Sequence, residues 1–194
     1  LTKAQQGRYA VGAFNANNME AVQAIVEAAE EEQAPVIVQI SPGAIAYAGM
    51  EFISAIVRIA GELASVPVAL HYDHGTDYEG NIQCLRAGFT SLMFDGSGLP
   101  LEDNIRVSAR IAEAAHACGI PLEAELGKIP DADEDVDWSA YYTDVAEAER
   151  FVKETGVDWL AISVGIMHGV PMTTPAHWTS IGSPRSGTPP GSRW

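Results

Sequence analysis

The chain has 194 residues, a length that suits one domain with a sizeable hydrophobic core. Hydrophobic residues make up 47% of it, which is typical of a soluble globular protein. Its 26 acidic residues outnumber its 11 basic ones, so the formal net charge is -15. Because nucleic-acid binding needs basic surface, this balance argues against a nucleic-acid partner.

The sequence also argues against a membrane protein and an exported protein. No apolar run approaches the roughly 20 residues that span a membrane, and the first residues, LTKAQQGRYA, contain no apolar signal-peptide core. The two cysteines, Cys84 and Cys118, lie in segments of helical pattern, which favours buried thiols over a disulfide. We therefore expect a protein of a reducing compartment, the cytoplasm, without a membrane partner.

Six short apolar runs indicate β-strands along the chain, at 9–14, 35–40, 66–71, 91–95, 121–126 and 159–164. Segments of helical period lie between them. The first follows Asn17 or Asn18, either of which can cap it. Its apolar face consists of Met19, Val22, Ile25, Val26 and Ala29. The other helical segments are 49–65, 77–87, 100–118 and 143–155.

Strand and helix alternate, and the strands are too apolar to face water on either side, so we expect a parallel sheet covered by helices. A doubly wound open sheet and a (β/α)8 TIM barrel both fit this pattern. Polar residues follow many of the strands, and in a barrel all of these strand ends meet at one face. We therefore favour an α/β fold with an incomplete (β/α)8 TIM barrel of about six βα units. The polar residues at strand ends are Asn15, Asn17, Ser41, Asp73, His74, Asp95, Ser97, Glu125 and His168.

The last 24 residues, 171–194, differ in composition from the rest of the chain. They hold 5 of the 11 prolines and none of the acidic residues, and no strand or helix pattern is present. We expect a partial barrel domain over 1–170 and an aberrant tail over 171–194, which a frame error or a truncation would explain.

The stretch VALHYDHGTD places two histidines and an aspartate at the end of an apolar run. Titratable side chains there are costly unless they have partners. A single histidine at a strand end is more often structural than a ligand, but His74 and His168 both follow a strand and both precede a glycine. Two or three imidazoles with one open position are typical of a catalytic zinc ion, so these two are the candidate ligands.

Five motifs resemble the class II, zinc-dependent fructose-bisphosphate aldolases and the related tagatose-bisphosphate aldolases, and they occur in the family's order. The resemblance runs from about Gly7 to Val170. The motifs are YAVGAFNANNMEAVQAIVEAAEEEQAPVIVQISPGAIAYAG, LHYDHG, SLMFDGS, EAELG and SVGIMHGV.

The resemblance implies roles around a metal. Asp73 would be the catalytic acid and base at the substrate hydroxyl, and His74 and His168 would bind the catalytic zinc. Asp95 and Glu125 would bind zinc at a second, displaced position.

The resemblance also implies phosphate contacts. Ser41 would contact one substrate phosphate, the Gly169 backbone would contact the other, and Asn15 would line the same pocket. A monovalent cation near the phosphate site is compatible with the family. The segment 131–137 holds five acidic residues, which fits either a solvated loop or the family's mobile loop over the site.

The implied reaction is reversible cleavage of a ketose 1,6-bisphosphate, fructose or tagatose, to dihydroxyacetone phosphate and glyceraldehyde 3-phosphate. Family members are homo-oligomers, so a dimer or a tetramer is expected. Two alternatives stay open: an inactive fragment without the third zinc histidine and second phosphate loop, and a zinc barrel hydrolase. The hydrolase explains His74, His168 and Asp95 but not Ser41 and Gly169.

Overall fold

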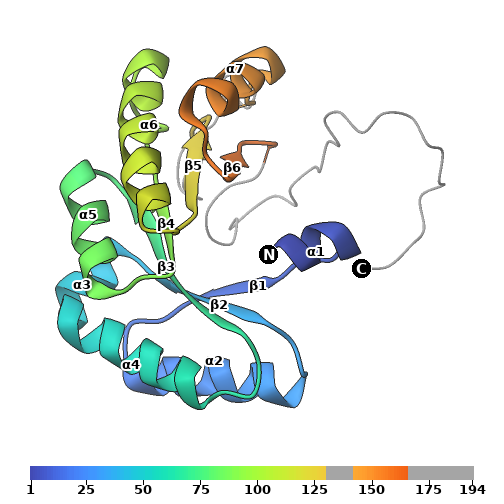
Figure 1. Cartoon of the computed structure of the whole chain (residues 1–194), viewed down its shortest axis with the longest axis vertical. Coiled ribbons are helices and arrows are strands. Elements are labelled where there is room, and N and C mark those ends of the chain that lie inside the picture. Colours follow the sequence, from blue (N-terminus) through green and yellow to red (C-terminus); the bar gives the residue numbers. More distant parts are fainter. Residues whose placement is uncertain (130–141, 166–194) are drawn as a thin grey trace, which may run out of the picture.

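A computed structural model of the chain describes residues 1–129 and 142–165 (Figure 1). Six strands alternate with helices in these ranges. The strands are β1 Gly12–Asn15, β2 Val36–Ile40, β3 Val68–Gly75, β4 Ser91–Phe94, β5 Leu122–Leu126 and β6 Trp159–Ile162. The helices are α1 Thr2–Gly7, α2 Met19–Glu31, α3 Pro42–Ala48, α4 Met50–Leu63, α5 Tyr78–Ala87, α6 Leu101–Ala117 and α7 Val145–Thr155.

The six strands form one parallel sheet in the order β1-β2-β3-β4-β5-β6, so each strand pairs with the strand before it in the chain. The sheet curls, and the helices lie along its outer side (Figure 1). This half-barrel is the architecture of an incomplete TIM barrel, and it confirms the predicted fold class. Because all strands are parallel, their carboxyl ends lie along the same edge of the sheet.

Local sequence signals explain where several helices begin and end. Asn18, not Asn17, caps α2, and its side chain accepts a hydrogen bond from the backbone N–H of Ala21. Asp77 caps α5 in the same manner. Gly88 ends α5 in the left-handed conformation that glycine adopts without steric cost.

The core lies between the sheet and the helices that cover it. Phe89, Phe94, Phe151 and Leu122 are among its largest fully buried side chains. Successive side chains of a strand point to opposite faces of the sheet. While the apolar ones pack against the helices, the inner face is left for the polar side chains described below.

Several expectations about local structure are wrong. The four residues of β1 are exposed because β1 pairs only with β2 among the described residues. The strand that was expected to end at residue 71 continues as β3 to Gly75, and helices α1 and α3 were not predicted at all. Cys118 is exposed at the end of α6, although Cys84 is buried as expected, and both are free thiols.

Several predictions fall outside the described residues: the ligand His168, Gly169, the acidic segment 131–137 and the tail 171–194. The proposed domain boundary at residue 170 therefore stays a prediction. Within the described ranges, no single helix is long and apolar enough to cross a membrane, and α3 and α4 pass that test only as a pair bent by 101°.

Candidate active site

The site begins at an irregularity in β3. The register between β3 and β4 shifts between Tyr72 and Gly75, and His74 has a φ of 52°, in the left-handed region. Such a bulge redirects the side chains that follow. A Cβ at Gly75 would meet the Tyr72 ring and would lie 2.8 Å from the Met93 carbonyl oxygen, so the close strand approach requires glycine.

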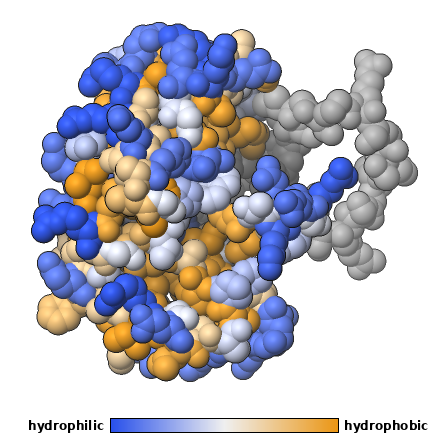
Figure 2. Space-filling view, in the orientation of Figure 1, coloured by the Kyte–Doolittle hydropathy of each residue, from blue (hydrophilic) through white to orange (hydrophobic). Residues whose placement is uncertain are grey.

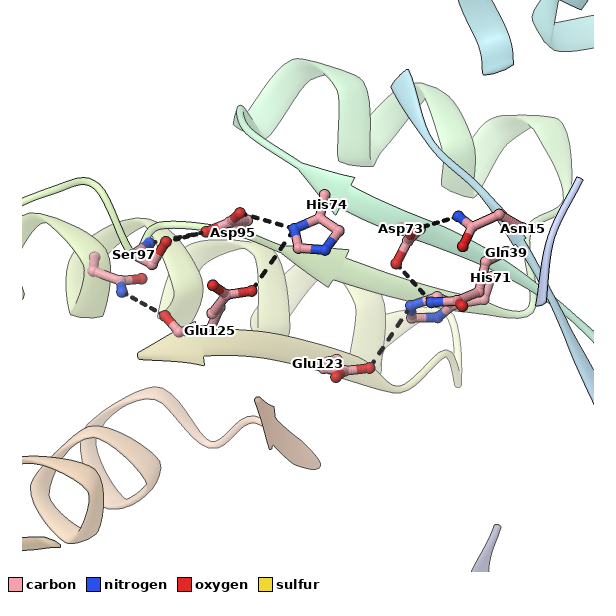
Figure 3. A network of polar contacts seen from close by, with 10 residues as sticks. Asn15, Gln39, His71, Asp73, His74, Asp95, Ser97, Glu123 and Glu125 are labelled. Atoms are coloured by element: carbon pink, nitrogen blue, oxygen red, sulfur yellow. Dashed lines mark hydrogen bonds and ion pairs between the residues drawn. The ribbon is translucent and has the colours of Figure 1, made fainter. Parts of the chain in front are cut away.

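The bulge sends two consecutive side chains to different neighbours. Figure 3 shows Asp73 pointing towards Asn15 and Gln39 of β1 and β2, whereas His74 points towards Asp95 and Glu125. An extended strand would place side chains 73 and 74 on opposite faces of the sheet. Here both side chains lie among polar groups near the carboxyl ends of the strands, and the bulge is the reason.

Two amide groups hold the Asp73 carboxylate. Asn15 Nδ2 donates to Asp73 Oδ2 at 2.8 Å, and Gln39 Nε2 donates to Oδ1 at 2.6 Å. The aspartate is 6% exposed. Because each oxygen accepts one donor from a different strand, the carboxylate has a fixed orientation in a largely dry site.

His74 lies between two carboxylates. Its Nδ1 is 2.9 Å from Asp95 Oδ2 and 3.7 Å from Glu125 Oε2. Ser97 fixes Asp95, since both its backbone N–H and its hydroxyl donate to Asp95 Oδ1, at 3.0 and 2.7 Å. Asn104 of α6 donates to the backbone carbonyl of Glu125 at 2.9 Å and so ties β5 to the helix behind it.

The electrostatics of this group favour a charged histidine. The hydrogen bond with Asp95 raises the pKa of His74 to about 9. Burial acts against this rise, whereas the charges of Asp73 and Glu125 add to it. Burial favours a higher pKa for Asp95, but the hydrogen bonds from His74 and Ser97 outweigh it, and the pKa falls to about 2. Burial and then the charge of Asp95 raise the pKa of Glu125 to about 7.

His74, Asp95 and Glu125 could hold a metal ion. One ligand atom from each of the three lies within 4.8 Å of the others. Imidazole nitrogen and carboxylate oxygen are zinc ligands, and at the usual bond lengths two ligand atoms of one zinc lie roughly 3.5 Å apart. The separations of 2.9 and 3.7 Å from His74 Nδ1 fit such a site.

The remaining predicted site residues are placed as follows. Asn15 ends β1 and contacts Asp73, as described above. Ser41 directly follows β2, and its hydroxyl caps α3 by accepting a hydrogen bond from the Ala44 N–H at 3.2 Å. Asn15 lies at the carboxyl end of β1 and Ser41 just past that of β2, and only β2 pairs directly with β3. His168 and Gly169 follow the described part of the chain.

Sequence reasoning missed Gln39, although it contacts the predicted catalytic residue directly. A signal was present, because Gln39 is the one polar residue in the apolar run VIVQI of β2. A polar side chain inside a buried strand needs a partner, and that partner is Asp73.

The sequence matches the family model described as Fructose-bisphosphate aldolase class-II over residues 1–182. The chain belongs to the class II fructose-bisphosphate aldolase family. A fructose-bisphosphate aldolase from Thermus caldophilus is 48% identical over 172 residues, which are 87% of this chain and 56% of the relative. One from Geobacillus stearothermophilus is 44% identical, with 87% of this chain and 60% of the relative covered.

A solved structure supports the same membership. The crystal structure of a putative fructose-1,6-bisphosphate aldolase from Coccidioides immitis matches with a TM-score of 0.82 at 33% identity. The match covers 92% of this chain and 63% of that structure's chain. The chain therefore spans less than two thirds of the length of these class II aldolases.

Proposed function

We propose that this chain carries the Asp73 and His74 part of a zinc-dependent aldolase site. The reaction is reversible cleavage of a ketose 1,6-bisphosphate, fructose or tagatose, to dihydroxyacetone phosphate and glyceraldehyde 3-phosphate. The observation that carries the proposal is the bulge in β3, which leaves Asp73 anchored by two amides and directs the next residue, His74, to Asp95 and Glu125. Family membership supports the phosphorylated sugar as the substrate class.

His74 and His168 would hold zinc, with Asp95 and Glu125 as ligands of a second position. A bound zinc supplies Lewis-acid stabilisation of the negative charge that develops on the ketone half of the substrate. Since His74 must lose its proton to bind metal, Asp95 has two roles: it holds the imidazole before binding, and it offers a carboxylate oxygen afterwards.

Asp73 would move the proton of the reaction. Its carboxylate takes the proton of the substrate hydroxyl as the carbon–carbon bond breaks, and it returns the proton in condensation. Asn15 and Gln39 fix the orientation of this carboxylate by one hydrogen bond to each oxygen. The remaining lone pairs are available to the substrate hydroxyl. No lysine is needed for this chemistry.

The phosphate groups would bind at neighbouring strand ends. Ser41, with its hydroxyl at the first turn of α3, would contact one phosphate, and the backbone of Gly169 would contact the other. Asn15 would line the same pocket, and a monovalent cation could neutralise charge there. The free thiols Cys84 and Cys118 suit a reducing compartment such as the cytoplasm.

The test is a coupled assay for triose phosphates with fructose and tagatose bisphosphates, run with zinc and with a chelator. We expect zinc-dependent release, and we expect Asp73→Asn to abolish it while zinc still binds. Asp77→Asn is the matched control, because the Asp77 side chain caps α5 and asparagine is an equally good cap. Zinc binding without any triose phosphate release would instead identify an inactive aldolase fragment. Hydrolysis of an ester or amide would identify a hydrolase.

We also propose that the working protein is a homo-oligomer, a dimer or a tetramer. Static light scattering after size-exclusion chromatography measures the molar mass directly. A single species at two or four times 20.6 kDa is the expected result, and a monomer would contradict the proposal.

A further inference from the structure

A row of polar side chains, which includes both amides that hold Asp73, crosses the four neighbouring strands β1 to β4. In the strand register Asn15 pairs with Gln39, Gln39 pairs with His71, and His71 pairs with Ser91. Register partners project from the same face of a sheet, so the four side chains lie at one level of the inner face. TIM-barrel interiors are filled mainly by branched apolar side chains, which makes an all-polar row unusual.

His71 is the buried centre of this row. It is 4% exposed, and its Nδ1 lies 2.8 Å from the Ser91 hydroxyl oxygen. On its other side, Nε2 lies 3.7 Å from Glu123 Oε2 of β5 (Figure 3). Burial lowers the pKa of His71 to about 4, although the charge of Asp73 opposes the shift. The ring is therefore neutral near pH 7, and one of its nitrogens carries a proton.

The surroundings of His71 include one amide that holds Asp73 and one further carboxylate, Glu123. Gln39, which donates to Asp73 Oδ1 at 2.6 Å, is the register neighbour of His71 on one side. Glu123 is a second carboxylate, and the charge of Asp73 acts on it after burial to raise its pKa. Loss of the imidazole would open space between Gln39, the register neighbour of His71, and the Glu123 carboxylate, which lies 3.7 Å from His71 Nε2.

We infer that His71 is a positioning residue: held by Ser91, its ring keeps the Gln39 amide on Asp73 and keeps the Glu123 carboxylate away from both. Asp73 then keeps one orientation, because its carboxylate is the acceptor that remains available to the Gln39 amide. The inference deepens the proposed function, on which it rests for the role of Asp73.

The test uses the side-chain amide signals of Asn15 and Gln39 in ¹⁵N–¹H spectra, which report whether these groups still donate to Asp73. In His71→Ala we expect the Gln39 amide protons to exchange about tenfold faster with water, or more, because the amide would alternate between two acceptors and water would enter the vacated space. The Asn15 signal should change much less, since Asn15 pairs with Gln39 and not with His71.

A second substitution separates positioning from packing. Glu123→Gln in the His71→Ala background removes the competing carboxylate, so the slow exchange of the Gln39 amide should return. His71→Asn keeps a polar atom near Ser91 and should show an intermediate rate even if the alanine variant folds poorly. Leu70→Ala is the matched control, because it opens a cavity on the helix side of the same strand, where Leu70 is 2% exposed.

Unchanged Gln39 exchange in both His71 variants would overturn the inference, and so would equal effects of Leu70→Ala and His71→Ala. Failure of Glu123→Gln to restore slow exchange would also overturn it. The measurement needs neither metal nor turnover. An absence of lyase activity would therefore contradict the proposed function and leave this result standing.

Discussion

The titration of His71 has a consequence for stability. The folded pKa of about 4 lies below the ordinary value of 6.5, so between these values the unfolded chain binds more protons than the folded chain. The contribution of His71 is fully present above pH 6.5, and it is lost as the pH falls towards 4. The shift of about 2.5 pH units corresponds to roughly 3 kcal/mol.

Urea unfolding between pH 7 and pH 4.5 measures this contribution. We expect the free energy of unfolding to fall with pH more steeply in the natural protein than in His71→Asn. Glu125 titrates in the same range with the opposite sign, because its folded pKa is raised. The difference between the two proteins cancels that effect, and parallel curves would refute the prediction.

The metal cluster leads to a prediction at a second residue. Asp95→Ala removes one of the three candidate ligand groups. Zinc affinity should fall at least about tenfold, because loss of a residue that only hydrogen-bonds to a metal ligand already costs that much. Competition with a chromophoric chelator at fixed pH gives the dissociation constant. Glu123→Ala is the control: it removes an acidic side chain of β5 that lies outside the cluster, so the zinc affinity of this variant should match that of the natural protein.

At the scale of single elements, β3 has little room for change at its bulge. Gly75→Ala would place a methyl group against the Tyr72 ring and the Met93 carbonyl, neither of which can move away cheaply. We expect a loss of about 2 kcal/mol or more in the free energy of unfolding.

Gly98→Ala provides the comparison, since a Cβ there meets nothing within 4 Å. Chemical denaturation of the two variants should give a large difference between them. Equal stabilities would mean that the bulge is not constrained as described, and that the placement of Asp73 and His74 needs another cause.

Most elements were predictable from the sequence because their signals are local. The apolar runs locate all six strands to within a few residues, and the capping residues locate the starts of helices such as α2 and α5. The continuation of β3 was not predictable. A left-handed conformation at His74 depends on the fit of β3 against β4, and no residue within the segment reports it.

The titratable residues of the candidate site could be predicted, because charged side chains at the ends of apolar strands are unusual. Which residues hold them by hydrogen bonds could not be predicted. His74, Asp95 and Glu125 come together in the structure, whereas Asp73 lies with Asn15 and Gln39, and their roles stay predictions. Gln39 was missed because an amide in a strand has many possible partners, and only the register brings it to Asp73.

At the scale of the whole molecule, the edge strand β1, which within residues 1–129 and 142–165 pairs only with β2, should govern behaviour in solution. Phe14 of β1 is 53% exposed and lines a groove of about 410 Å³ with residues of α2. Figure 2 shows hydrophobic residues at the surface in the lower part of this view, near α2 and α4. Exposed apolar surface beside an open strand edge promotes association.

Phe14→Lys should therefore reduce light scattering at high protein concentration. Phe52→Lys is the control: Phe52 is 73% exposed on α4, away from the strand edge, so the same change there should have a smaller effect. Equal reductions would indicate general surface hydrophobicity rather than the edge.

The sequential order of the strands has a consequence for synthesis. Because every strand pairs with its predecessor, each new pairing closes a short loop and needs nothing from later in the chain. The sheet can thus grow one strand at a time as the polypeptide leaves the ribosome. Because β1 and β2 precede β3 in the chain, Asn15 and Gln39 would be synthesised and paired before Asp73. The Asp73 carboxylate could form both hydrogen bonds as soon as β3 pairs with β2.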